Sequence, residues 1–246
     1  MPKKSFLVLV FASIVAVGVF AQTPFSFSLG GGPFFSGGFG GGYDLSAEVN
    51  GFTVEATQKM PYFGGGLSVF FDLTYAELAF SFFASGGEIS LKSKGSFGAF
   101  NFNGERNEKL EYTIMSCNIG LLGKYPFAIN NKMTIFPLFG IDYQIVFYFR
   151  DVYGKGYEGL DGKGRDVDFS ALWFKLGAGF DFSFTKHIFL KTEALYGIRL
   201  PNKFEKDIVD YYNEMIESVK LAGGSGKVSA RLGHGLAVKA AIGYRF

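Results

Sequence analysis

The C-terminal segment, residues 231–246, alternates between large apolar residues and residues that are small or charged. Every second residue from Leu232 is apolar or aromatic, apart from His234: Leu232, Leu236, Val238, Ala240, Ile242, Tyr244 and Phe246. The positions between them include Lys239 and Arg245. Because successive strand residues point to opposite faces, this segment predicts a β-strand with one apolar face and one face that carries cations.

The same alternation recurs along most of the chain and predicts a series of antiparallel strands. With the C-terminal segment, the predicted strands are 25–35, 67–74, 78–82, 112–124, 133–149, 172–184 and 188–200, which makes eight. In 112–124 the phase is ambiguous. The favoured assignment turns Met115, Cys117, Ile119 and Leu121 to the apolar face and Ser116, Asn118 and Lys124 to the other. Pro137 cannot donate to a neighbouring strand and predicts a bulge or a locally broken pair.

The connections between these segments alternate in length. Short connections are expected near 72–75, 125–131 and 185–187, and long ones over 41–60, 90–109, 151–167 and 201–228. Short turns at one end and long loops at the other are typical of outer-membrane barrels, and a soluble β-sandwich would not sort its loops in this way.

The last long connection contains a different period. Its apolar residues recur every three or four positions: Phe204, Ile208, Tyr211, Tyr212, Met215 and Val219. This spacing predicts an amphipathic helix over 204–221 that stops at Gly223-Gly224. We expect the helix to cap the barrel mouth, with a position on the outer leaflet as the alternative. A flexible loop with chance periodicity is the third interpretation.

The N-terminal segment has the features of a secretory signal peptide. Lys3 and Lys4 precede an apolar run over 6–20, and Val19-Phe20-Ala21 forms a small-x-small cleavage site. A membrane anchor is the alternative, although the run is short beside the ~20 apolar residues of a spanning helix. We therefore divide the chain into a signal peptide, residues 1–21, and a barrel domain, residues 22–246.

Composition and charge narrow the class of protein. The chain has 246 residues, with 35 Gly, 31 Phe and 18% aromatic residues, which suits a protein that meets lipid on one surface. Without Lys3 and Lys4, the 24 basic residues fall to the number of acidic ones, 22, so no nucleic-acid partner is expected. The mature chain has no continuous aliphatic stretch long enough for a spanning helix, so it would cross a membrane only as a closed barrel.

The charged residues sort to the face opposite the apolar one. These predicted lumen charges are Asp181, Lys191, Glu193, Arg199, Lys239 and Arg245. With 185–187 as a turn, Asp181 falls opposite Lys191, and we expect the two to form an ion pair. Eight strands enclose an interior just wide enough for side chains to fill, so a wide pore is not expected.

The signal peptide, the eight strands, the loop asymmetry and the terminal Phe246 together resemble the small bacterial outer-membrane barrels of the OmpA, OmpX and OmpW type. The resemblance implies an all-β fold, an eight-stranded antiparallel up-and-down transmembrane β-barrel with long extracellular loops, one of which contains a helix. It also implies a location in the outer membrane of a diderm bacterium, contact with outer-membrane lipids, and a C-terminal targeting signal at Tyr244 and Phe246 that the outer-membrane assembly machinery reads.

Candidate catalytic residues are few. His187 falls in a predicted turn and His234 on the lipid-facing phase near the rim, and Ser229 is the only serine near His234 in sequence. A serine hydrolase needs a serine and a carboxylate beside its histidine. Cys117 is alone and fits a small apolar residue. We expect no enzyme activity, no cofactor and no metal.

Two functions remain. The first is a structural or surface protein whose loops bind extracellular ligands. The second is a narrow channel for small or apolar solutes, which aromatic residues at interior positions, Phe70, Phe83 and Trp173, would favour.

The signal-peptide assignment can be tested directly. Mass spectrometry of the protein from the membrane fraction should find cleavage after Ala21 and a mature N-terminus at Gln22, because Val19 and Ala21 flank Phe20 as small residues. Recovery of intact residues 1–21 would contradict the assignment.

Overall fold

The computed structural model describes residues 26–97, 106–151, 156–158 and 169–246, and the predicted signal peptide lies outside them. The described strands form one antiparallel sheet. They are β1 (Phe27–Gly40), β2 (Tyr43–Val49), β3 (Phe52–Lys59), β4 (Tyr62–Leu73), β5 (Ala76–Phe97), β6 (Arg106–Lys124), β7 (Phe127–Asn130), β8 (Met133–Asp151), β9 (Gly156–Glu158), β10 (Ala171–Ser183), β11 (Ile188–Arg199), β12 (Ser225–Ala230) and β13 (Gly233–Arg245). The helix is α2 (Lys203–Leu221).

Part of this sheet closes into a ring. The strands β5, β4, β1, β13, β11, β10, β8 and β6 pair in that order, and β6 pairs back onto β5. Ring neighbours follow one another in chain order, and β13 closes onto β1. The described sheet therefore has 13 strands rather than the eight predicted, since short strands were missed outside the ring.

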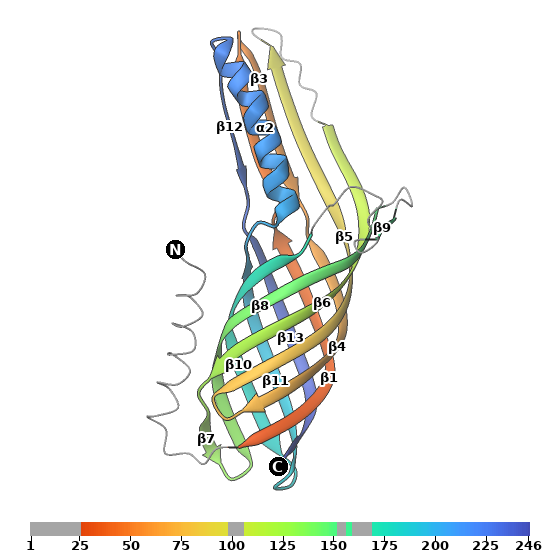
Figure 1. Cartoon of the computed structure of the whole chain (residues 1–246), viewed down its shortest axis with the longest axis vertical. Coiled ribbons are helices and arrows are strands. Elements are labelled where there is room, and N and C mark those ends of the chain that lie inside the picture. Colours follow the sequence, from red (N-terminus) through yellow and green to blue (C-terminus); the bar gives the residue numbers. More distant parts are fainter. Residues whose placement is uncertain (1–25, 98–105, 152–155, 159–168) are drawn as a thin grey trace.

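The remaining larger strands build an extension at one end of the ring. There the sheet order is β12-β2-β3-β5-β6, and Figure 1 shows this part rising well beyond the barrel. We call it the extension, and its end of the barrel the extension end. The opposite end carries the short connections and the C-terminus and is called the turn end (Figure 1).

The prediction of a long loop over 41–60 is wrong, because β2 and β3 form a hairpin there. Val49 pairs with Phe52, and the two residues between them, Asn50 and Gly51, have φ values of 51° and 77°. An Asn-Gly pair with positive φ is the turn that matches the twist of two antiparallel strands. This short signal was available in the sequence and was overlooked.

The predicted loop over 90–109 is also wrong in its described parts. β5 continues to Phe97 and β6 begins at Arg106, and the two stay paired as far as Ser93 and Arg106. The segment resembled a loop because it is polar. Beyond the ring, however, a strand can be polar on both faces and still be held by its backbone hydrogen bonds.

The helix prediction is confirmed, and its predicted position is wrong. Asn202 caps α2: its side chain accepts from the Glu205 backbone N–H at 2.8 Å, and Glu205 accepts from the Asn202 N–H at 3.0 Å. The helix does not lie over the mouth. It stands along the extension (Figure 1) and packs on β2 and β12 through Tyr43, Ile216 and Val228.

The helix lies along the extension and not over the mouth because β2 and β12, which were not predicted, supply the apolar surface on which it packs. Ile208, Val209 and Tyr212 complete its buried face. Tyr211 and Met215, which were assigned to that face, are 62% and 51% exposed. No helix in the described part of the chain is long and apolar enough to cross a membrane.

Ring strands turn their apolar residues outward. The exposed belt comprises Leu29, Phe35, Phe39, Phe63, Leu67, Val69, Phe71, Phe80, Phe82, Met115, Ile119, Ile135, Phe139, Tyr143, Phe174, Leu176, Tyr196, Leu236, Val238, Ile242 and Tyr244. The favoured phase of 112–124 is confirmed, since Met115 and Ile119 are exposed whereas Ser116 and Lys124 are buried. The ring is thus apolar outside, and its interior combines buried charged side chains with buried aromatic ones.

The pairing of β8 with its neighbours is irregular at two places. Pairing with β6 ends at Leu138 and pairing with β7 starts at Ile135, so Pro137 lies in the predicted break and keeps only its β10 partner, Ala178. A register shift opposite Met115 and Ser116 leaves one extra residue in β8. Strict alternation from the exposed Tyr143 would place Phe149 on the outward face, but the extra residue turns it into the interior, where it is buried.

The packing of α2 gives a stability prediction. Ile216→Ala should destabilise the helix on its sheet by about 2–5 kcal/mol, because it empties a buried site, whereas Met215→Ala on the exposed face should cost well under 1 kcal/mol. Hydrogen exchange of the α2 amides measures both. Equal protection in the two variants would contradict the observed packing.

Candidate functional site

Five charged side chains meet in the middle of the ring. The Lys191 ammonium lies 2.7 Å from Asp72 Oδ2 and 2.6 Å from Glu77 Oε2. Lys239 joins Glu77 Oε1 at 2.6 Å and Glu193 Oε2 at 2.7 Å. All five side chains are almost completely buried. These residues form what we call the lumen network, which spans the interior from β4 and β5 to β11 and β13.

Aromatic rings close the space around the lumen network. Lys191 Nζ lies 4.3 Å from the ring centre of Phe70 and 5.3 Å from that of Phe136. Lys124 extends the network by contacting Asp72 at 2.5 Å and lies over Phe136 as well. Buried cations over aromatic faces are attracted by the ring quadrupole. The middle of the ring is therefore filled by side chains.

Asp181 and Lys191 are direct cross-strand neighbours, as predicted from the turn. The predicted ion pair between them is not formed. The Lys191 ammonium extends across the interior to Asp72 and Glu77. Asp181 Oδ2 instead lies 3.8 Å from Arg245. The alternation of residues predicts which side chains of a strand point into the barrel. It does not predict which residue on a distant strand a long side chain will contact, so Asp72 and Glu77 were not among the predicted lumen charges.

The other predicted residues lie at the two ends. Arg199 is at the extension end, where it donates to Glu205 Oε1 at 2.6 Å. Arg245 is at the turn end, 4.9 Å from the Phe189 ring. Tyr244 and Phe246 are exposed there, and the Phe246 ring stacks on Phe27 with centroids 4.9 Å apart.

Glu205 joins the helix to the rim of the barrel. Besides Arg199, its Oε1 accepts from the Gly42 backbone N–H at 2.7 Å. Gly41 has a φ of 71°, and a Cβ there would lie 2.3 Å from Arg199 Nη2, so glycine is required at this junction. The start of α2, the end of β11 and the start of β2 are thus held at one buried carboxylate.

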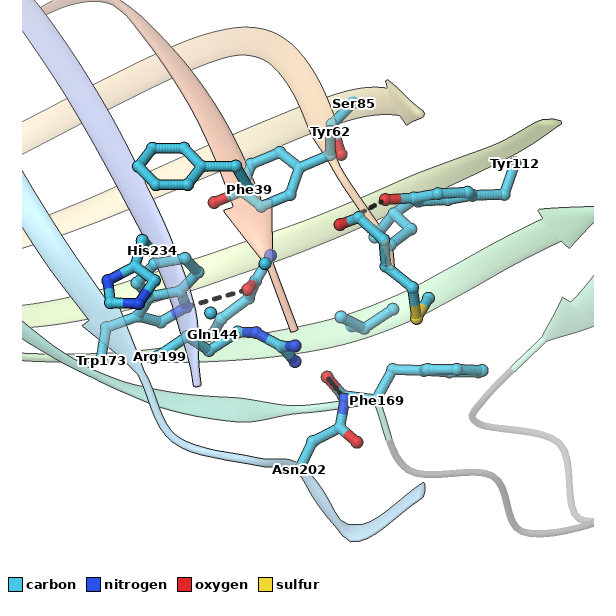
Figure 2. Close-up of a pocket in the computed structure, with 15 residues that line it drawn as sticks. Phe39, Tyr62, Ser85, Tyr112, Gln144, Phe169, Trp173, Arg199, Asn202 and His234 are labelled. Atoms are coloured by element: carbon cyan, nitrogen blue, oxygen red, sulfur yellow. Dashed lines mark hydrogen bonds between the residues drawn. The ribbon is translucent and has the colours of Figure 1, made fainter. Parts of the chain in front are cut away.

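A small cavity lies at the mouth beneath this junction (Figure 2). Its volume is about 40 Å³, and Tyr62, Tyr112, Trp173 and Gln144 are among its walls. Trp173 Nε1 donates to Gln144 Oε1 at 3.1 Å, and Tyr112 donates to the Pro61 carbonyl at 2.9 Å. Ligand pockets usually have volumes of about 300–1,000 Å³, so this cavity holds little more than water.

The histidines lie outside the lumen. His234 is on the outward phase, as predicted, with Nδ1 2.6 Å from the Tyr196 hydroxyl and its ring stacked on Phe39. His187 lies in the turn and has Nδ1 2.9 Å from the Arg245 carbonyl. Within the described segments, no group of three or more His, Cys, Asp or Glu side chains could hold a metal ion.

The closed ring, its exposed apolar belt and its buried charges are the arrangement of a membrane-spanning β-barrel of the outer-membrane type. The ring leaves no unpaired strand at the level of the belt, as lipid requires. A soluble barrel would instead bury its apolar face and expose its charges.

Comparisons with known proteins found similar solved structures but no matching family model and no matching curated protein. The outer membrane protein OprG from Pseudomonas aeruginosa is 12% identical over 90% of this chain and 95% of its own, with a TM-score of 0.38. Ail from Yersinia pestis, solved with the heparin analogue sucrose octasulfate, is 14% identical over 90% and 99%, with a TM-score of 0.30. The N-terminal β-barrel domain of Pseudomonas aeruginosa OprF is 12% identical over 86% and 97%, with a TM-score of 0.31.

The lumen network gives a prediction about coupling. Lys191→Met or Glu77→Gln alone should each destabilise the barrel by about 3–5 kcal/mol, because the remaining charges stay buried with fewer partners. The double variant should cost less than the sum. The control pair, Lys191→Met with Asp181→Asn, should couple more weakly, since the ion pairs of Lys191 are with Asp72, Glu77 and Glu193.

Urea unfolding of the protein in lipid vesicles measures both cycles. Equal coupling energies in the two cycles would contradict the contacts of Lys191.

Proposed function

We propose that this protein is an integral outer-membrane barrel whose function is to present the extension outside the cell for binding to extracellular ligands. The observation that carries the proposal is the extension itself: strands β2, β3 and β12 with helix α2, built on the outer halves of β5 and β6 (Figure 1). Short turns face the periplasm in barrels of this type, so the extension would face outward.

The extension is firmly attached to the barrel, which supports a binding role. β5 and β6 run without interruption from the ring into the extension. Glu205 fixes the start of the helix to Arg199 and Gly42. A surface held in one geometry loses less conformational entropy on binding than a flexible loop does.

Exposed side chains on the extension would meet the ligand. On the helix these include Tyr211 and Met215, which lie beside each other one turn apart and face away from the sheet. Tyrosine and methionine are enriched at protein interfaces, because each offers a large contact area. The opposite face of the sheet is polar, with Glu55 paired to Lys94. An extracellular protein is therefore the proposed class of ligand.

The alternative is a narrow channel. The buried lumen network and the surrounding rings favour display over conduction, because a solute would have to displace Lys191 and Glu77 together. Phe70, Phe83 and Trp173, which suggested an apolar path, are all at most 5% exposed.

Conductance separates the two functions. The purified protein in a planar bilayer should show no steady conductance, whereas a wide-pored porin in the same bilayer conducts. Open events that change with Lys191→Met would instead support the channel.

A second measurement tests display directly. Vesicles that carry the protein should adhere to surfaces coated with extracellular-matrix proteins, and the double substitution Tyr211→Ser and Met215→Ser should reduce adhesion. Lys220→Ser, elsewhere on the helix, is the matched control. Adhesion that is absent, or unchanged in the double variant, would count against this helix face as the binding surface.

A further inference from the structure

A hollow on the outer wall lies where β5 and β6 leave the ring. Two neighbours stop here: β4 begins at Tyr62 and β8 ends at Asp151, whereas β5 and β6 continue into the extension (Figure 1). The hollow is open, with a volume of about 820 Å³. Most of its lining points outward: Phe63, Gly86, Glu88, Glu111, Thr113 and Arg150.

Two neighbouring glycines shape the hollow in different ways. A Cβ added at Gly86 would meet only the Tyr112 carbonyl, at 3.7 Å, so nothing fills the outer side of β5 at this point. At Gly87 a Cβ would lie 2.1 Å from the Pro61 carbonyl and 2.7 Å from the Tyr112 ring, so the floor is tightly packed. The hollow therefore opens outward, and Tyr62 and Tyr112 separate it from the small cavity at the mouth, which they also line.

The chemistry of the hollow changes along the barrel axis. Toward the ring lie exposed members of the apolar belt, Phe63 at 69% and Phe82 at 61%. Toward the extension lie charges: Arg150 faces Thr113 across the β6–β8 pair, and Glu88 faces Glu111 across the β5–β6 pair. The change from apolar to charged groups along the barrel axis matches the boundary between the acyl chains and the headgroups of a membrane.

Arg150 is the cation among the lining residues of the hollow. Lys109, outside the lining, lies 2.9 Å from the Glu88 carboxylate and forms an ion pair with it. Among the side chains that the structure describes, no carboxylate forms an ion pair with Arg150, and its neighbour across the β6–β8 pair, Thr113, carries a hydroxyl. A free guanidinium beside a hydroxyl is a favourable pair of donors for a phosphate group, since charge-assisted hydrogen bonds to phosphate are among the strongest in proteins.

We propose that this hollow binds a phosphate-bearing lipid of the outer leaflet. Its phosphate lies on Arg150 and Thr113, and its acyl chains run along Phe63 and Phe82. The site is continuous with the apolar belt, which already contacts lipid. The inference rests on the proposed placement of the protein in the outer membrane. It does not depend on which ligand the extension binds.

The lipid could be a phospholipid or a phosphorylated glycolipid, and one experiment separates the sources. Native mass spectrometry of the full chain in detergent would follow retention of three probes: phosphatidylethanolamine, lipid A and a diacylglycerol. The two phosphorylated probes, or one of them, should be retained, and the diacylglycerol should not. Preference for lipid A identifies a glycolipid, and preference for phosphatidylethanolamine a phospholipid.

Two variants and one control test the site. Arg150→Ala should weaken retention about tenfold, the usual loss for a charge-assisted contact. Gly86→Leu should weaken it by filling the hollow, and its Cβ has room. Lys227→Ala, an exposed cation on β12, should leave retention unchanged. Equal retention of diacylglycerol, or equal losses in Arg150→Ala and Lys227→Ala, would overturn the proposal.

Folding and membrane insertion of each variant are measured in a separate assay, in which a folded and inserted barrel stays folded in cold detergent and a protein that has not inserted does not. A variant that inserts normally but loses the phosphorylated lipid supports the site. A wild-type protein that inserts but retains no phosphorylated lipid overturns the lipid site alone. A protein that fails to insert overturns the proposed function.

Discussion

Closure of the ring is the constraint on which the rest of the structure depends. A strand in a bilayer has no water to satisfy an unpaired N–H or C=O, and each such group costs several kcal/mol there. The pairing of β1 with β13 removes the last free edge of the ring. It also brings the ends of the described chain together, since the Phe246 N–H donates to the Phe27 carbonyl at 3.0 Å.

Closure determines where the charges lie. Once the outer face meets lipid, polar groups on the ring strands must face the interior, and eight ring strands leave room there only for side chains. Burial of a charge is costly unless other charges and hydrogen bonds satisfy it. In the lumen network Glu77 is shared between Lys191 and Lys239, and each of the five charges lies within 4 Å of at least two opposite charges, counting the contact of Lys124 with Asp72.

The extension follows a different rule because it lies beyond the ring. Among the described strands, β12 and the outer part of β6 form the two edges of its sheet. Water can satisfy those edges, so the strands need no closure. The apolar face left by β2 and β12 still has to be covered, and α2 covers it through Ile216. The hollow lies at the boundary between the two parts, where β5 and β6 pass from the closed ring into the extension.

The sequence by itself determined the presence of the ring strands, the facing of most of their residues and the helix, because these follow from local periodicity. Phe180 and Asp181, for example, fall on opposite faces whatever the neighbours are. The interruption at Pro137 was equally readable, because a missing N–H is a local property. Only the tertiary structure decided which distant groups meet. The polar outer part of β5 is a strand because β3 and β6 pair with it, α2 stands upright because β2 and β12 cover its apolar face, and Lys191 contacts Glu77 rather than Asp181 because the closed ring brings β5 within reach of its side chain.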